Sequence, residues 1–333
     1  MRIAVFLLML GLSFPFTVHA EEASTDAFMP TSSVFRVRAQ NPNGIVNIGS
    51  AVLVQPGKLV TNCHVTREAR HIMVIRGSAA WNVESQFRDI EHDLCILAVP
   101  DVVGEVPGFA KASELKVGET VHALGYAGLS QLTFSYGEVI ALHSYDGARI
   151  IQTSASFVLG ESGGGLFDKQ GHLVGIITFK ARASGVFHFA LPVEWVHAVL
   201  AMAESKVTVT IPEANKAFWE RPSEEQPNFM RAASFESEKN WSRLLAFAQG
   251  WIEADTTNAG AWVAKSKALH YLNHEFEAVS AFLEAVRLDP SYTQDEYPLN
   301  VTYDDLDEST QARNLRTLLN PSRQFILMET KAH

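Results

Sequence analysis

Apolar side chains recur in short runs from about residue 33 to residue 192, and turn-forming residues separate the runs. The turn signals include Asn43-Gly44, Pro56-Gly57, Asp146-Gly147 and Gln170-Gly171. Short runs with this punctuation are typical of an all-β sandwich or barrel. The strands that we expect are Val34–Val37, Gly49–Val54, Leu59–Val60, Ile72–Ile75, Leu94–Val99, Thr120–Leu124, Gly137–Ala141, Ile150–Gln152, Leu173–Thr178 and Val186–Leu191.

The pattern changes after Pro192, and the rest of the sequence is predicted to be helical. Val193–Ser205 has the periodicity of an amphipathic helix that closes the β region. A linker-like stretch with Pro212, Pro222 and Pro227 follows it. The last third has helical periodicity, so we expect a β part followed by an α part.

The helical part contains an internal repeat, which we refer to below as the sequence repeat. The better copy has the spacing of a tetratricopeptide repeat (TPR) at Trp262, Ala278, Phe282, Ala285 and Pro290. A weaker copy lies one TPR period earlier, at Leu244, Ala248, Trp251, Asp255 and Thr256. We expect a capping helix at Thr310–Leu319, and the alternative to a repeat is a generic helical hairpin. Because two such repeats form a short groove for extended peptides, we expect this region to recruit a protein partner and to be separable from the chemistry.

The N-terminus has the pattern of a secretory signal peptide. Arg2 supplies the positive charge, Ile3–Phe16 the apolar core, and Val18-His19-Ala20 the small residues of a cleavage site. The competing interpretation is an uncleaved membrane anchor, but Gly11, Ser13 and Pro15 interrupt the run, which is shorter than the ~20 residues that span a bilayer. We therefore predict cleavage after Ala20, export to the periplasm or the medium, and no stable membrane span in the mature protein.

Composition and charge exclude some classes of function. With 47% hydrophobic and 19% charged residues, the protein has the composition of an ordered globular protein. The net charge of −10 argues against nucleic acid as a partner, because phosphate binding needs a basic surface. The two cysteines, Cys63 and Cys95, are either a disulfide or a pair of buried thiols, and the sequence leaves both alternatives open.

Three short segments supply the groups needed for nucleophilic catalysis. They are Thr61-Asn62-Cys63-His64-Val65, Glu91-His92-Asp93-Leu94-Cys95 and Gly160-Glu161-Ser162-Gly163-Gly164-Gly165. A serine needs a neutral imidazole to take its proton, and the imidazole needs a carboxylate to fix its tautomer. We therefore predict Ser162 as the nucleophile, His64 as the base and Asp93 as the orienting carboxylate. The glycines around Ser162 would let the N–H groups of Gly160 and Ser162 converge as an oxyanion hole.

These segments resemble the trypsin-like serine peptidases of the bacterial Deg/HtrA-type branch. The histidine block is similar at residues 49–65, the aspartate block at residues 93–97, and the serine block at residues 152–164. The resemblance implies a chymotrypsin-like double antiparallel β-barrel, with His64 and Asp93 from the first barrel and Ser162 from the second. Glu161 and Gly165 stand where relatives often carry Asn and Pro, and the helical repeats occupy the place of a PDZ-like module.

The specificity pocket is expected between the segment before Ser162 and the strand Val186–Phe189. Its predicted lining residues are Ser154, Ser156, Phe157 and His188. None of them is acidic, so we expect an apolar or small side chain before the scissile bond. His188 has two interpretations: it could recognise an acidic side chain of the substrate, or it could be an ordinary hydrogen-bonded histidine of the strand. His270 and His274 lack a third ligand, so we expect no metal and no cofactor.

The expected organisation is therefore a chymotrypsin-like double β-barrel followed by a TPR-like helical hairpin array. We expect a signal peptide (1–20), an N-terminal extension (21–32), a peptidase domain (33–203), a linker (204–224), a TPR-like domain (225–320) and a tail (321–333). The predicted function is a serine endopeptidase acting on proteins or peptides. The alternative is a catalytically idle peptide-binding scaffold or chaperone-like protein, and labelling of Ser162 by a fluorophosphonate separates the two.

Overall fold

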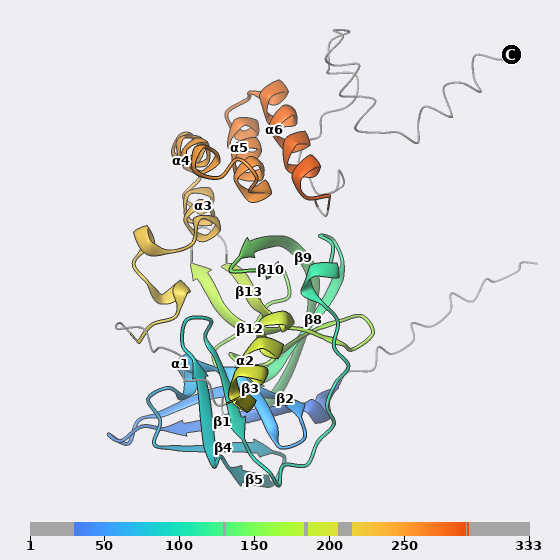
Figure 1. The fold of residues 1–333 in the computed structure, drawn as a ribbon, viewed down its shortest axis with the longest axis vertical. Helices are drawn as coiled ribbons and strands as arrows, with labels where there is room; N and C mark the ends of the chain where they lie inside the picture. Colours follow the sequence, from blue (N-terminus) through green and yellow to red (C-terminus); the bar gives the residue numbers. More distant parts are fainter. Residues whose placement is uncertain (1–29, 129–130, 183–185, 206–214, 291, 293–333) are drawn as a thin grey trace, which may run out of the picture.

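The computed structural model describes residues 30–128, 131–182, 186–205, 215–290 and 292. A β-rich part forms two units, and four helices stack on the end of the second unit (Figure 1). The predicted signal peptide, the capping helix Thr310–Leu319 and the tail 321–333 lie outside the described residues. No helix of the described part is long and apolar enough to cross a membrane.

The first β unit is a seven-stranded antiparallel sheet in the order β5-β4-β1-β2-β3-β7-β6. Its strands are β1 (Val34–Gln40), β2 (Val46–Gln55), β3 (Lys58–Asn62), β4 (His71–Arg76), β5 (Ala79–Asn82), β6 (Ser85–Asp89) and β7 (Leu94–Ala98). The short helix α1 (Cys63–Thr66) follows β3 directly. Phe35, Leu53, Leu59 and Leu97 fill the core of this unit.

The second β unit is a closed barrel in the order β10-β13-β12-β11-β8-β9. Its strands are β8 (Thr120–Ala127), β9 (Gln131–Tyr145), β10 (Ala148–Thr153), β11 (Gly165–Asp168), β12 (Leu173–Arg182) and β13 (Val186–Pro192). Asp146 and Gly147 connect β9 to β10 with φ of 41° and 74°, a two-residue turn whose twist suits a hairpin. The helix α2 (Val193–Ser205) follows β13.

The β architecture is confirmed, with two differences from the expectation. The first unit is an open, half-barrel sheet with edge strands β5 and β6, whereas only the second is a closed barrel. In addition, β5, β6 and β11 have no counterpart among the predicted strands. β5 and β6 consist largely of exposed or half-buried residues, so they lack the apolar alternation that marks a strand in the sequence.

The four helices after the β units form two successive hairpins. They are α3 (Asn228–Ser237), α4 (Trp241–Ala254), α5 (Ala259–Tyr271) and α6 (Glu275–Leu288). Helix α6 begins and ends one period of the sequence repeat after α4, and α5 ends one period after α3. The turns between the helices of each hairpin place Lys239 and Asn273 at φ of 53° and 63°. The sequence repeat therefore has a structural counterpart, while its assignment to the TPR class stays a prediction.

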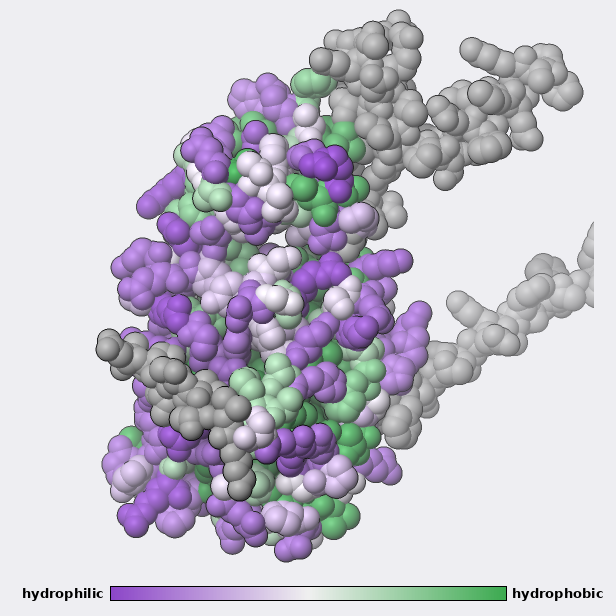
Figure 2. Space-filling view, in the orientation of Figure 1, coloured by the Kyte–Doolittle hydropathy of each residue, from purple (hydrophilic) through white to green (hydrophobic). Residues whose placement is uncertain are grey.

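The hairpins share one continuous apolar core with the barrel. Phe229 of α3 is buried with its ring centroid 4.6 Å from that of His143 on β9 and 5.9 Å from that of Phe189 on β13. Tyr292 donates to the carbonyl of Leu142, and its hydroxyl lies 3.1 Å away. Hydrophilic residues prevail on the visible outer face of the helices (Figure 2). The helical region is therefore part of the folded body of the molecule, unlike the separable module expected from the sequence.

Burial of His143 in this interface requires that its imidazole is neutral. Burial, together with the charge of the nearby Lys267, lowers the pKa of His143 to about 4, although its hydrogen bond to Gln152 has the opposite effect. A neutral ring stacks on Phe229 without the cost of burying a charge. The interface thus joins the barrel and the helices as an apolar contact.

Replacement of Phe229 by alanine should destabilise the whole protein, because it opens a cavity in the core shared by the barrel and the helices. We expect a loss of about 3–5 kcal/mol in the free energy of unfolding, measured by chemical denaturation. Phe276→Ala is the matched control, since Phe276 of α6 is 44% exposed and should change the free energy of unfolding little. Equal effects of the two variants would contradict the shared core.

Candidate active site

His64 is fixed by the junction between β3 and α1. The N–H of Cys63 and the Asn62 side-chain amide both donate to the carbonyl oxygen of Asp93, each at 3.1 Å. The start of α1 is therefore hydrogen-bonded to the backbone of Asp93, although Cys63 and Asp93 are far apart in the sequence. The His64 side chain is 22% exposed, so it is partly accessible to solvent.

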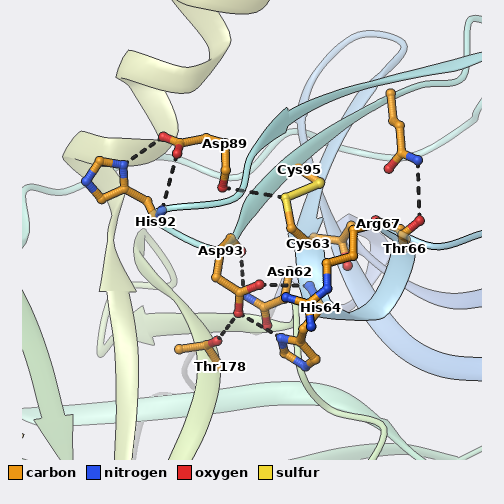
Figure 3. The surroundings of a disulfide bond; sticks show 12 residues. Asn62, Cys63, His64, Thr66, Arg67, Asp89, His92, Asp93, Cys95 and Thr178 are labelled. Carbon is orange, nitrogen blue, oxygen red and sulfur yellow. Dashed lines mark hydrogen bonds and ion pairs between the residues drawn. A yellow bond between two sulfur atoms is a disulfide. The ribbon is translucent and has the colours of Figure 1, made fainter. Parts of the chain in front are cut away.

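Asp93 lies in the turn before β7 and faces His64 (Figure 3). Its φ of 58° is in the left-handed region, which aspartate visits more readily than most residues. Asp93 therefore lies outside the regular alternation of strand β7, which begins at Leu94. Instead, the turn directs the Asp93 carboxylate toward His64, with Nδ1 of His64 at 2.7 Å from Oδ2.

The carboxylate of Asp93 is completely buried and accepts hydrogen bonds from four donors. The His64 N–H donates to Oδ1 at 2.8 Å. The other three donors, His64 Nδ1, Thr178 Oγ1 and Trp219 Nε1, share Oδ2 at 2.7, 2.9 and 3.2 Å. Because an unpaired buried charge is very costly, these bonds are what allows a carboxylate to lie here.

Thr178 and Trp219 are site residues that the sequence analysis missed. Thr178 ends a predicted strand, where a hydroxyl residue is unremarkable. Trp219 lies in the expected linker, 126 residues from Asp93, and no local pattern indicates its contact. Only the three-dimensional fold brings these two donors to the aspartate.

Thr178 connects Ser162 to the pair of His64 and Asp93 by hydrogen bonds. The Oγ of Ser162 donates to the Thr178 carbonyl oxygen at 3.2 Å, while the hydroxyl of Thr178 binds Asp93. Gly163 follows Ser162 at φ of 88°, and a Cβ there would lie 2.1 Å from the carbonyl oxygen of Ser50. The structure therefore brings His64, Asp93 and Ser162 to one place, with the serine hydroxyl turned to the Thr178 carbonyl.

The loop before Ser162 has its peptide groups fixed by neighbouring segments. The Leu159 carbonyl accepts from the Gly128 N–H at 3.2 Å, and the Glu161 carbonyl from the Gly164 N–H at 2.8 Å. Because both peptide bonds are trans, the N–H groups of Gly160 and Ser162 are directed opposite to those carbonyls. Within the described part of the protein, neither N–H donates to another protein group. Both N–H groups could therefore donate to an oxyanion, as the predicted oxyanion hole requires.

Glu161 ties this loop to the barrel. Its side chain is buried, and its carboxylate accepts hydrogen bonds from the hydroxyl of Thr133 on β9 and from the N–H of Val158. The carbonyl of Gly160 accepts from the buried Ser50 hydroxyl at 2.9 Å. The residue that departs from the usual asparagine thus holds the loop by internal hydrogen bonds.

The four predicted pocket residues have different surroundings. Phe157 and His188 are buried and pack on one another, with ring centroids 4.6 Å apart. Ser154 and Ser156 are exposed and bound to β9, where the Ser154 hydroxyl accepts from the Glu138 N–H and the Ser156 carbonyl accepts from Ser135. Their role in substrate recognition stays a prediction.

Cys63 and Cys95 form a disulfide beside His64 and Asp93, with Cα atoms 5.0 Å apart (Figure 3).

His270 lies near the end of α5, and its Nδ1 atom is 2.9 Å from Oε1 of Glu275. Among the described residues, no cluster of three or more His, Cys, Asp or Glu side chains is arranged to hold a metal ion.

The charges around His64 favour its protonated form. Burial lowers the pKa of His64, but the charge and the hydrogen bond of Asp93 raise it more, so that the pKa lies above its ordinary value. Glu220 raises it further and Arg67 opposes this effect. Arg67 and Glu220 form an ion pair, with the Arg67 Nη2 atom 2.8 Å from Glu220 Oε1. The neutral imidazole is therefore the form present at higher pH.

Substitutions in the Arg67–Glu220 ion pair should shift the pKa of His64 in opposite directions. Glu220→Gln should lower the pKa of His64, because it removes a negative charge and leaves Arg67 unbalanced, whereas Arg67→Gln should raise it. A titration of the His64 ring protons by NMR measures both shifts. Lys58→Gln is the control, because neither Lys58 nor its partner Glu204 is among the charges that shift the pKa of His64. Shifts of the same sign in the first two variants would refute this electrostatic assignment.

Comparisons with known proteins match part of this sequence to the trypsin-like peptidases. Residues 49–176 match the family described as trypsin-like peptidase domain. Serine protease HTRA4 of Mus musculus is 34% identical over 157 residues, which cover 43% of this chain and 32% of that protein. Mitochondrial serine protease HTRA2 of Drosophila erecta is 29% identical over 182 residues, which cover 51% of this chain and 41% of that protein.

A solved structure supports the same relationship. The HtrA-type protease AlgW with a tripeptide has a TM-score of 0.50 and 26% sequence identity over 54% of this chain and 62% of that protein. The sequence spans less than half of the length of the curated relatives named above. The resemblance predicted from the histidine, aspartate and serine blocks is confirmed for this part. Residues 49–176 are therefore similar to the trypsin-like peptidase domains of HtrA proteases.

Proposed function

We propose that residues 33–203 form a serine endopeptidase domain in which Ser162, His64 and Asp93 are the catalytic triad. The hydrogen bond between His64 Nδ1 and the buried carboxylate of Asp93 is the observation that carries the proposal. Because Nδ1 donates to the carboxylate, Nε2 is left as the acceptor for a serine proton. The similarity to HtrA proteases supports protein or peptide substrates.

The reaction begins with a rotation of the Ser162 side chain. In the resting arrangement its hydroxyl donates to the Thr178 carbonyl, and catalytic hydrogen bonds often tighten only when substrate is bound. Once Oγ turns to His64, Nε2 takes its proton while Oγ attacks the scissile carbonyl carbon. The resulting oxyanion would accept from the N–H groups of Gly160 and Ser162.

The acyl-enzyme forms when the tetrahedral intermediate collapses. The C–N bond breaks, and the imidazolium of His64 gives its proton to the leaving amine. Water then attacks the ester carbonyl, with His64 again acting first as base and then as acid, and Ser162 is regenerated. Asp93 remains a carboxylate throughout and stabilises each imidazolium.

The compartment and the helical region complete the proposal. We infer export to the periplasm or the medium, since the Cys63–Cys95 disulfide fits an oxidising compartment and the N-terminus has the signal pattern.

The matching bounds of α4 and α6, one period of the sequence repeat apart, support a pair of TPR-like repeats. A cavity of about 350 Å³ between these hairpins and the barrel, lined in part by Phe229, Val263 and Ile140, offers space for a segment of a protein partner or substrate.

Loss of the nucleophile should abolish proteolysis and leave the fold intact. Ser162→Ala should lower the rate of casein cleavage by at least about 1,000-fold, and His64→Ala should do nearly as much, because the triad acts as a unit. A fluorophosphonate should label wild-type protein at Ser162 and leave Ser162→Ala unlabelled. Ser144→Ala, at an exposed serine on β9, is the control that keeps both activities. Undiminished cleavage by Ser162→Ala would contradict Ser162 as the nucleophile. A wild-type protein that neither cleaves casein nor reacts with the fluorophosphonate would favour the alternative, in which the β region is an idle peptide-binding scaffold.

A further inference from the structure

The catalytic pair is contacted by a segment that follows the peptidase domain in the sequence. This segment, Ala217–Arg221, includes a short 3-10 helix (Phe218–Glu220) and precedes α3; we call it the clasp. Trp219, its central residue, donates from Nε1 to Oδ2 of Asp93 at 3.2 Å. The Trp219 ring also meets His64 edge-on, with centroids 5.4 Å apart and planes at 89°.

Residues on both sides of Trp219 hold the clasp in place. Glu220 pairs with Arg67, which lies three residues after His64, and Arg221 pairs with Glu91, which lies two residues before Asp93. The N–H of Phe218 also donates to the carbonyl of Glu91 at 3.1 Å. The anchors of the clasp are therefore sequence neighbours of the two catalytic residues.

The clasp is also joined to the rest of the molecule on its far side. Phe218 is completely buried in the core that runs from the barrel into the helices. The Gln226 side chain donates to the carbonyls of Trp219 and Arg221 at 3.0 and 2.9 Å, immediately before α3 begins at Asn228. The position of Trp219 is thus determined by the barrel, the first sheet and the segment entering α3.

We propose that Trp219 is a positioning residue of the catalytic pair, and this proposal rests on the proposed peptidase function. Its N–H is one of three donors on Oδ2 of Asp93 and keeps the carboxylate from turning away from His64. Its ring limits the tilt of the imidazole and the access of water to that edge. The segment that follows the β units therefore supplies a component of the active site.

Trp219→Phe tests this role, because it removes the N–H and keeps a ring of similar shape. With a small peptide substrate, kcat should fall by about tenfold, the order expected for one lost bond to a charged group, while KM stays unchanged because Trp219 does not bind substrate. The acid limb of kcat/KM should move to higher pH. A carboxylate with fewer donors stabilises the imidazolium more strongly, so neutral His64 is reached only at higher pH.

Trp262→Phe is the matched control. The Trp262 indole donates to the Thr256 carbonyl at 3.1 Å within the helical hairpins, so this variant also loses one N–H donor and should keep the wild-type kcat and pH profile. Arg221→Gln, which loosens one anchor of the clasp, should change kcat and the pH profile in the same direction as Trp219→Phe and by less. Thermal unfolding of each variant establishes that the folded fraction is the same.

An NMR titration of His64 in the Ser162→Ala background makes the test independent of activity. A second replacement, Trp219→Phe, should raise the pKa of His64 in that background. An unchanged kcat together with an unchanged His64 pKa would overturn the role of Trp219, even if the wild-type protein is an active peptidase. Failure of the wild type to react with a fluorophosphonate would instead overturn the proposed function, and the titration would still decide whether Trp219 acts on His64.

Discussion

The buried carboxylate of Asp93 is the constraint on which the rest of the site depends. A charge with no exposure to solvent is tolerated only when donors replace the lost water, and here four donors do so. These donors come from α1, from β12 and from the clasp, which are distant in the sequence. The need to solvate one carboxylate therefore brings together the first sheet, the barrel and the segment that leads into the helices.

A second set of contacts fixes the two β units around this carboxylate. His92, the residue before Asp93, lies between Asp89 of the first unit and Asp146 of the β9–β10 turn, with 2.7 Å between ring nitrogen and carboxylate oxygen on each side. Burial lowers the pKa of His92, but the hydrogen bonds and charges of Asp89 and Asp146 raise it more. On the other side of Asp93, the disulfide joins α1 to β7. The backbone is therefore held by contacts on both sides of Asp93, at His92 before it and at Cys95 after it.

The sequence predicted the features that depend on local chemistry. The segments around His64, Asp93 and Ser162 were recognisable because the proposed catalysis demands particular residue types. Most of the buried strands were recognisable from their apolar runs, whereas the short buried strand β11 was missed. The strands β5 and β6, which consist largely of exposed or half-buried residues, carry no such pattern, and the sequence does not show the left-handed turn conformation of Asp93. The contact of Trp219 and the core shared by Phe229 and the barrel arise from tertiary packing. No residue pattern near them in the sequence reports that packing.

The central claim is that Asp93 fixes His64 with its proton on Nδ1 and its Nε2 free to accept from Ser162. The most direct measurement is the ¹⁵N chemical shift of both His64 ring nitrogens in the full-length protein, at a pH where the ring is neutral. We predict a protonated Nδ1 and an unprotonated Nε2, and loss of this preference in Asp93→Ala. A neutral ring with its proton on Nε2, or an equal mixture of the two tautomers, would contradict this arrangement of the site.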